Sequence, residues 1–146
     1  MNKPDDNAER EFFKNAILHR AQISLEIYEQ TGGEILYGPF AGMRLIRNNS
    51  WVGDGDVAPK ILGFYEMELV PEIERASRAG YQSVVNVGAA EGYYAVGMLR
   101  MMPDARVYAF DIDENAQSIC REAGKLNGVE QRLEVGGLCT PEVLSE

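Results

Sequence analysis

The sequence has 146 residues, which is enough for one domain with a modest hydrophobic core. Its formal net charge of -9 argues against a broad phosphate-binding surface, and therefore against nucleic acid as a partner. Two cysteines are too few for a disulfide framework, and one histidine supports neither a histidine-based metal site nor a catalytic triad. The chain also has no apolar run of the roughly 18 residues needed to span a membrane, and no signal peptide. We expect a cytoplasmic protein with reduced thiols.

The first half of the chain predicts a helix, a hairpin and a second helix. Apolar residues at helical spacing predict a helix from Ala8 to about Gln30, followed by a glycine stop. Residues 35–46 predict a β-hairpin with a glycine- and proline-containing turn. Residues 61–79 predict another helix, in which Pro71 either kinks the chain or starts a new helix. We assign residues 1–79 to an N-terminal extension.

Four side chains in this half have both a possible functional role and an ordinary structural one: Asp54, Asp56, Trp51 and His19. Asp54 and Asp56 suggest calcium, but the loop lacks the terminal glutamate of an EF-hand, which favours a solvated turn. Trp51 could cover a ligand, although a packing anchor is the more common role of such a residue. His19 lies in the first predicted helix without a carboxylate partner in the pattern, which favours a solvated or partly packed side chain.

The second half alternates short strands with helices, and this order predicts a parallel α/β sheet with right-handed crossovers. The predicted strands are Ser83–Val87, Arg106–Phe110 and Arg132–Val135; the predicted helices are Gly92–Met102, a helix capped by Asp113 that ends at Asn127-Gly128, and one starting at Pro141. In such a sheet, ligands bind beyond the carboxyl ends of the strands.

The first of these strand ends is rich in small residues. Gly88, Ala90 and Gly92 are spaced two and two, which lets a ligand approach the backbone closely at the start of a helix. A dinucleotide fingerprint places its third glycine one residue later, where this chain has Tyr93. The spacing therefore favours S-adenosylmethionine over a nicotinamide cofactor.

The second strand ends in an acidic tip. Asp111 follows Gly92 by 19 residues, and a carboxylate at this place can accept both hydroxyls of a ribose. Ile112 can lie against the face of a purine, and Asn86 can orient a polar tail by hydrogen bonds. Glu91 is favoured near the positive end of a helix dipole, with or without a ligand.

Two stretches together resemble the first two motifs of the class I S-adenosylmethionine-dependent methyltransferases: Val85-Asn86-Val87-Gly88-Ala89-Ala90-Glu91-Gly92-Tyr93-Tyr94 and Ala109-Phe110-Asp111-Ile112-Asp113. The Gly-Ala-x-x-Gly-x-Tyr pattern is most similar to the FkbM-type branch, and the resemblance covers about residues 80–140. It implies that the glycine loop lines the methionine part of the cofactor, Asp111 holds the ribose, Ile112 flanks the adenine, and residues 137–139 approach the adenine edge. The cofactor-binding residues expected on this basis are Asn86, Gly88, Ala89, Ala90, Glu91, Gly92, Tyr93, Asp111, Ile112 and Cys139.

The chain departs from the family in three respects. The family usually has an acidic residue at the position of Asn86, and Ala90 narrows the pocket by a methyl group. The family's sheet also continues past its third strand, so residues 80–146 resemble a truncated, Rossmann-like half-domain with an incomplete sheet. An unpaired edge of the first strand favours association. The hairpin at residues 35–46 or a second copy of the chain could cover it.

The resemblance implies methyl transfer to a hydroxyl of a small molecule or glycan, by in-line displacement without a metal. No residue stands out as the catalytic base, because packing or capping is the default role of Tyr93, Tyr94, Glu91 and Cys139. One alternative is a non-catalytic cofactor-binding or interaction fragment. A nicotinamide-dependent oxidoreductase domain and an α/β domain whose glycine loop is only a tight turn are the others.

Overall fold

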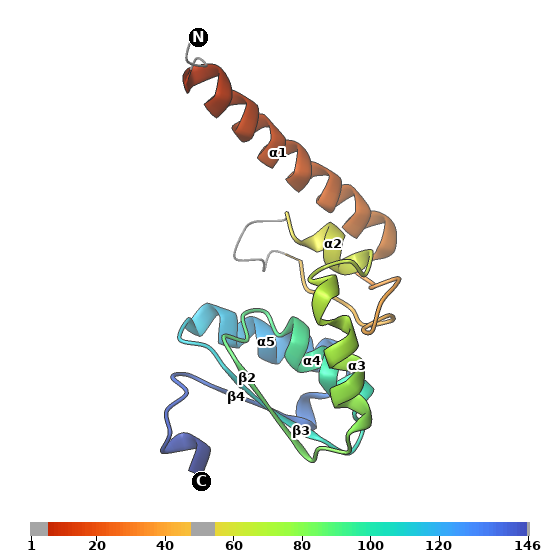
Figure 1. The fold of residues 1–146 in the computed structure, drawn as a ribbon, viewed down its shortest axis with the longest axis vertical. Coiled ribbons are helices and arrows are strands. Elements are labelled where there is room, and N and C mark those ends of the chain that lie inside the picture. Colours follow the sequence, from red (N-terminus) through yellow and green to blue (C-terminus); the bar gives the residue numbers. More distant parts are fainter. Residues whose placement is uncertain (1–5, 48–54, 146) are drawn as a thin grey trace.

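The computed structural model of the chain describes residues 6–47 and 55–145 (Figure 1). The predictions for Trp51 and Asp54 lie outside the described residues. A long helix, α1 (Asp6–Thr31), confirms the first predicted helix and projects away from the rest of the molecule. Within the described ranges, no helix is both long and apolar enough to cross a membrane.

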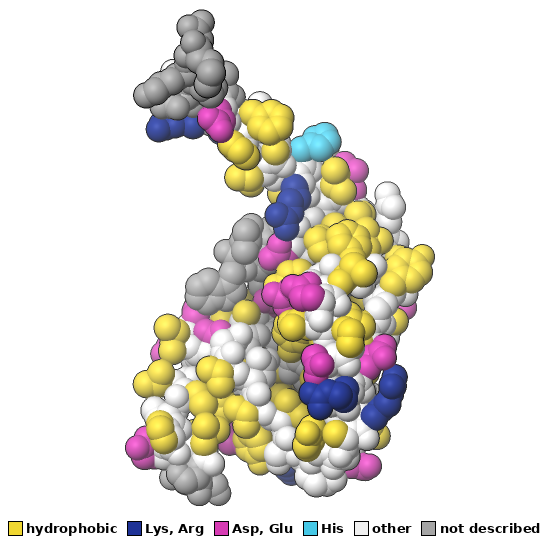
Figure 2. Space-filling model, in the orientation of Figure 1, with side chains coloured by type: hydrophobic (Ala, Val, Ile, Leu, Met, Phe, Trp, Pro, Cys, Tyr) yellow, Lys and Arg dark blue, Asp and Glu magenta, His cyan; other side chains and the backbone are white. Residues whose placement is uncertain are grey.

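Only the C-terminal half of α1 is packed against other elements. Ser24 is fully buried: its hydroxyl donates to the Gly55 carbonyl and accepts the Ala58 amide of α2 (Val57–Ile61). In contrast, Phe13 and Ile17 are 56% and 66% exposed. Figure 2 shows hydrophobic side chains exposed along the projecting part of the helix, beside the exposed His19. The predicted apolar face of α1 is therefore packed against other elements over only about the C-terminal half of the helix.

The predicted hairpin at residues 35–46 is wrong as a pair of strands. The segment is a loop closed by an isolated antiparallel bridge between Glu34 and Arg44, with Ile35 N–H donating to Met43 O at 2.8 Å. A regular ladder would continue with the Met43 amide donating back to the Ile35 carbonyl. The Gly42 amide takes this acceptor at 2.8 Å, and the Met43 amide donates to Phe40 O at 3.0 Å within the turn, so the pairing ends here. The Leu36 amide, on the other side of the segment, donates to the carbonyl of Ile61 in α2 at 2.8 Å.

The predicted helical segment over residues 61–79 is interrupted earlier than expected. The chain forms α2, a 3-10 turn η1 (Met67–Leu69) and then α3 (Val70–Arg78). The break occurs at Gly63, which has a φ of +74° and lies so close to the backbone of Tyr37 that a Cβ would clash. Pro71 stands in the first turn of α3, which confirms the prediction that a new helix could start there.

Three strands form the predicted parallel sheet, in the order β2-β3-β4. They are β2 (Ser83–Val87), β3 (Arg106–Phe110) and β4 (Leu133–Gly136), joined by α4 (Tyr93–Met101), α5 (Glu114–Leu126) and the 3-10 turn η2 (Glu130–Arg132). Both helices contact the sheet and each other, and they cover one of its faces (Figure 1). The fold is therefore mixed α/β and Rossmann-like, with an open parallel sheet of three strands among the described residues.

The ends of these elements follow local sequence rules. The Asp113 carboxylate accepts a hydrogen bond of 2.9 Å from the Asn115 amide, which confirms the predicted N-cap of α5. The predicted C-terminal helix from Pro141 is reduced to the short 3-10 turn η3 (Val143–Ser145). β4 begins one residue later than predicted and ends at Gly136.

The loop at residues 33–47 packs on the outer surface of the two helices. Phe40 is 2% exposed and lies against Gly97 of α4, where the ring leaves no room for a Cβ. The Asn127 side chain exchanges hydrogen bonds of 2.8 and 2.9 Å with the backbone of Arg44. This loop therefore covers the helices rather than the edge of the sheet, and self-association through that edge stays a prediction.

Candidate functional site

The loop between β2 and α4 has an unusual backbone. Gly88, Ala90 and Gly92 have φ angles of +72°, +46° and +86°. The left-handed conformation costs a non-glycine residue such as Ala90 about 1–2 kcal/mol. The Phe110 carbonyl accepts the amides of Gly88 at 2.8 Å and Ala89 at 2.9 Å, which binds the start of the loop to β3.

The three small residues of this loop have different surroundings. A Cβ on Gly92 would lie 2.8 Å from the Cys120 Sγ, so this glycine allows α4 to approach α5. A Cβ on Gly88 would meet no atom of residues 6–47 or 55–145 within 4 Å. Gly92 therefore serves helix packing, whereas Gly88 faces open space.

Asp111 lies just beyond β3, and its side chain holds the glycine loop. The residue is only 8% exposed, and its Oδ2 accepts the Ala90 amide at 2.8 Å while Oδ1 accepts the Asp113 amide at 3.0 Å. A carboxylate has about four lone-pair sites, so two remain for further donors. Asp111 thus holds the loop in place and can still accept further hydrogen bonds.

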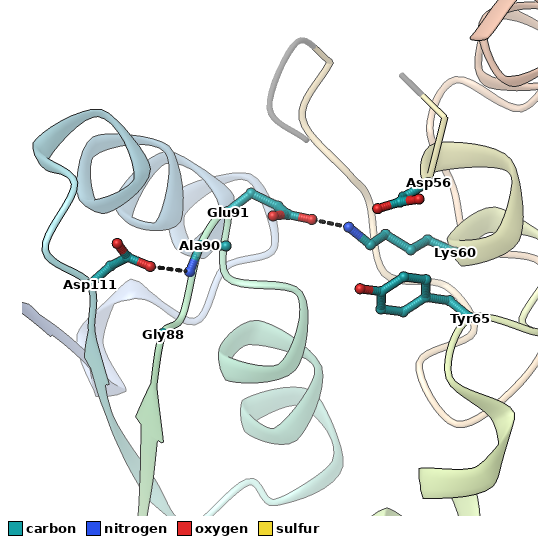
Figure 3. A pocket seen from close by; sticks show the side chains of 7 residues that line it. All are labelled: Asp56, Lys60, Tyr65, Gly88, Ala90, Glu91 and Asp111. Atoms are coloured by element: carbon teal, nitrogen blue, oxygen red, sulfur yellow. Dashed lines mark hydrogen bonds and ion pairs between the residues drawn. The ribbon is translucent and has the colours of Figure 1, made fainter. Parts of the chain in front are cut away.

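These elements open onto a cavity of about 430 Å³ (Figure 3). The residues that line it are Asp56, Lys60, Tyr65, Gly88, Ala90, Glu91 and Asp111. Four of them, Gly88, Ala90, Glu91 and Asp111, come from the two motifs expected to bind the cofactor, and the other three come from α2 and its neighbours. The cavity therefore lies between the carboxyl edge of the sheet and the segment at residues 55–65.

Lys60 is the buried cation of this cavity. The residue is 5% exposed, and its Nζ forms an ion pair with the Glu91 carboxylate (Figure 3). The same Nζ lies 4.8 Å from the ring centroid of Tyr65 and 5.5 Å from that of Tyr93. Buried charges need a partner of opposite sign, and aromatic faces add to the attraction.

Asp56 connects the cavity wall to α1. Its Oδ1 pairs with the Arg20 guanidinium at 2.6 Å, and Arg20 Nε donates to the Gly55 carbonyl at 2.9 Å. This pairing places Asp56 in a structural ion pair. Across residues 6–47 and 55–145, no three His, Cys, Asp or Glu side chains are grouped so that they could hold a metal ion.

The tyrosines near the cavity hold their protons firmly. Burial, together with the nearby Tyr65 and the charges of Glu66 and Glu91, raises the pKa of Tyr93 to about 12. Burial and a hydrogen bond to Glu66 raise the pKa of Tyr94 further. Both phenols are therefore neutral at physiological pH and are poor proton acceptors.

The remaining residues expected at the cofactor lie outside the cavity lining. Ala89 is 6% exposed and belongs to the core, together with Tyr93, while Ile112 is 77% exposed. Cys139 is a partly exposed free thiol. The side-chain oxygen of Asn86 is buried without a hydrogen-bond partner among the described residues.

Sequence reasoning did not place residues 55–65 at the cofactor site: it considered Asp56 only for calcium or a solvated turn, and it did not single out Lys60 or Tyr65. The local signal for Lys60 is a lysine among the apolar residues Val57, Ala58 and Ile61, which are buried in the structure. A lone cation among such residues is expected to be paired when it is buried. The sequence does not say which carboxylate pairs with it.

No protein-family model matches this sequence, and no curated protein does. Among solved structures, one titled "Crystal structure of MccD protein" is similar in fold, with a TM-score of 0.45 and 15% sequence identity. The similarity covers 52% of this chain and 34% of that chain, so this chain spans about a third of that protein. A similarity of this size says nothing about what this chain binds.

Proposed function

We propose that the cavity binds S-adenosylmethionine and that the chain is the cofactor-binding part of an S-adenosylmethionine-dependent methyltransferase of the FkbM type. The observation that carries the proposal is the geometry of Asp111. Its carboxylate is buried at the end of β3, holds Ala90 and Asp113 by their amides, and keeps two acceptor sites. Two vicinal ribose hydroxyls are donors that match this capacity.

Two further features fit this cofactor. Gly88 lines the cavity without any atom within 4 Å of its missing Cβ, which leaves room beside the backbone. The buried side-chain oxygen of Asn86 has no hydrogen-bond partner among the described residues, and it is an acceptor that the ligand's ammonium group could satisfy through water. Both residues belong to the motif on which the resemblance depends.

The charge of the cavity favours a cationic ligand over a dinucleotide. Its lining contains three carboxylates, of which Asp56 pairs with Arg20 and Glu91 with Lys60. The Asp111 carboxylate is therefore left without a cationic partner among the described residues. A pyrophosphate would add negative charge to this surface. The sulfonium and ammonium groups of S-adenosylmethionine would instead be attracted to it.

Bound S-adenosylmethionine supplies an electrophilic methyl group, and the chain's own residues would bind and orient it. Asp111 would hold the ribose and fix the glycine loop through Ala90, while Tyr65 would close the opposite side. We assign no catalytic base, because the tyrosines remain protonated. The acceptor that we propose, a hydroxyl of a small molecule or glycan, follows from the resemblance alone.

The test is calorimetric titration of the purified chain with S-adenosylhomocysteine, with NAD as the control ligand. Binding of S-adenosylhomocysteine but not NAD supports the proposal. Binding of NAD alone would favour the oxidoreductase alternative. A folded chain that binds neither ligand would contradict the proposal and favour an interaction fragment.

A further inference from the structure

Lys60 occupies a position where packing alone would favour an apolar side chain. Its neighbours in α2, Val57, Ala58 and Ile61, are buried, and so is Lys60 itself. Replacing a buried ion pair by apolar residues of similar size is often neutral or stabilising. The pair with Glu91 therefore calls for an explanation other than stability.

The partner of Lys60 lies next to a residue with a strained backbone conformation. Glu91 directly follows Ala90, whose φ of +46° is in the left-handed region. Asp111 holds this peptide from the β3 side through the Ala90 amide, and Lys60 holds the adjacent side chain from the α2 side. Figure 3 shows the two contacts on opposite sides of the loop. Asp111 and Lys60, both buried and charged, thus hold the consecutive residues Ala90 and Glu91.

We propose that Lys60 is a positioning residue of the ligand site: it fixes the glycine loop through Glu91 and neutralises that carboxylate at the cavity wall. The role in ligand binding rests on the proposed function, whereas the role in fixing the loop does not. Lys60 acts through Glu91, and the rings of Tyr65 and Tyr93 help to hold its ammonium in place. The segment at residues 55–65, which the resemblance does not cover, thereby becomes part of the site.

This arrangement has a consequence for the charge of the bound ligand. S-adenosylmethionine carries a sulfonium, whereas S-adenosylhomocysteine has a neutral thioether in the same place. Lys60→Met leaves the Glu91 carboxylate uncompensated, which favours the cationic ligand relative to the neutral one. Glu91→Gln leaves the Lys60 ammonium uncompensated, which has the opposite effect.

The first experiment measures the loop without any ligand. The double variant Lys60→Met/Glu91→Gln removes the pair without leaving a lone buried charge, so it is expected to fold. Hydrogen exchange at the amides of Ala90 and Gly92 should become about tenfold faster, while amides of β3 keep their protection. The control is Lys14→Met, which removes an exposed lysine of α1. Unchanged exchange at both loop amides would overturn the proposal.

The second experiment compares the affinities of S-adenosylmethionine and S-adenosylhomocysteine by calorimetry at low salt. The ratio of the two dissociation constants should shift about threefold or more in opposite directions for Lys60→Met and Glu91→Gln. Lys60→Arg keeps the positive charge and should leave the ratio unchanged. A pair with a structural role only would weaken both ligands equally, and an unchanged ratio would contradict the charge role. If the unmodified chain binds neither ligand, the proposed function fails, and the exchange measurement still decides the role of Lys60 in the loop.

Discussion

The Ala90 amide donates a hydrogen bond of 2.8 Å to the Asp111 carboxylate, although the two residues are 21 positions apart in the sequence. The bond joins the loop after β2 to the end of β3 at the carboxyl edge of the sheet. Because Ala90 has a positive φ, the bond also stabilises a conformation that alanine rarely adopts. The conformation of the loop and the orientation of the Asp111 carboxylate therefore depend on each other.

Asp111→Asn should weaken S-adenosylhomocysteine binding by more than about tenfold, because charge-assisted hydrogen bonds are roughly twice as strong as neutral ones. Calorimetry on the folded variant measures the effect. The control is Asp104→Asn, which changes the same residue type at an exposed position in the turn before β3. If the Asp111 variant kept the affinity of the unmodified chain, Asp111 would not be the ribose acceptor.

Gly88→Ala and Gly80→Ala form a matched pair. Both glycines have similar φ angles, +72° and +74°, and neither has an atom within 4 Å of its missing Cβ. Each substitution should lower the free energy of unfolding by about 1–2 kcal/mol, the cost of the left-handed conformation, as measured by urea unfolding. Only Gly88 lines the cavity, so only Gly88→Ala should also reduce ligand affinity, by about tenfold. Equal affinities in the two variants would argue that the ligand does not approach this loop.

The sequence predicts the sheet and its loops well because their signals are local. The strand over Ser83–Val87, the cap at Asp113 and the acidic strand end at Asp111 each depend on a few neighbouring residues. Parallel strand order then places the glycine loop and Asp111 at one edge without any knowledge of contacts.

The far wall of the cavity could not be predicted in the same way. Lys60 and Glu91 are 31 positions apart, and no spacing rule pairs them. The hairpin prediction failed because Gly42, and not Met43, donates to the Ile35 carbonyl, which ends the pairing at the turn. The turn packs on α4, where Phe40 lies against Gly97. Both outcomes depend on contacts that the local pattern does not contain.

The two cysteines should differ strongly in reactivity. Cys120 is fully buried, and burial, the largest cause, raises the pKa of its thiol to about 11, whereas Cys139 is partly exposed. Alkylation at about pH 8, followed by mass spectrometry, should modify Cys139 in the folded chain and Cys120 only after unfolding.

The same reaction tests the expected position of residues 137–139. If this segment lies at the adenine edge, saturating S-adenosylhomocysteine should slow alkylation of Cys139 by about threefold or more, because the ligand restricts access to the thiol. The variant Cys139→Ser should lose the modification entirely. A ligand that binds by calorimetry without slowing the reaction would place this segment away from the site.

Stability at high pH should depend on Tyr93, whose ring packs edge-on against Phe40 and Tyr65 with centroid distances of 5.1 and 5.5 Å. Burial raises the pKa of Tyr93 from 10.0 to about 12, so the folded chain holds this proton more tightly than the unfolded chain. The resulting stability is fully present below about pH 10 and is lost as the pH rises towards about 12. Tyr93→Phe keeps the ring and removes the proton. In urea unfolding at about pH 9 and about pH 11, the unmodified chain should therefore lose more stability than the variant. An equal loss in both would show that the phenol of Tyr93 ionises as readily in the folded chain as in the unfolded one.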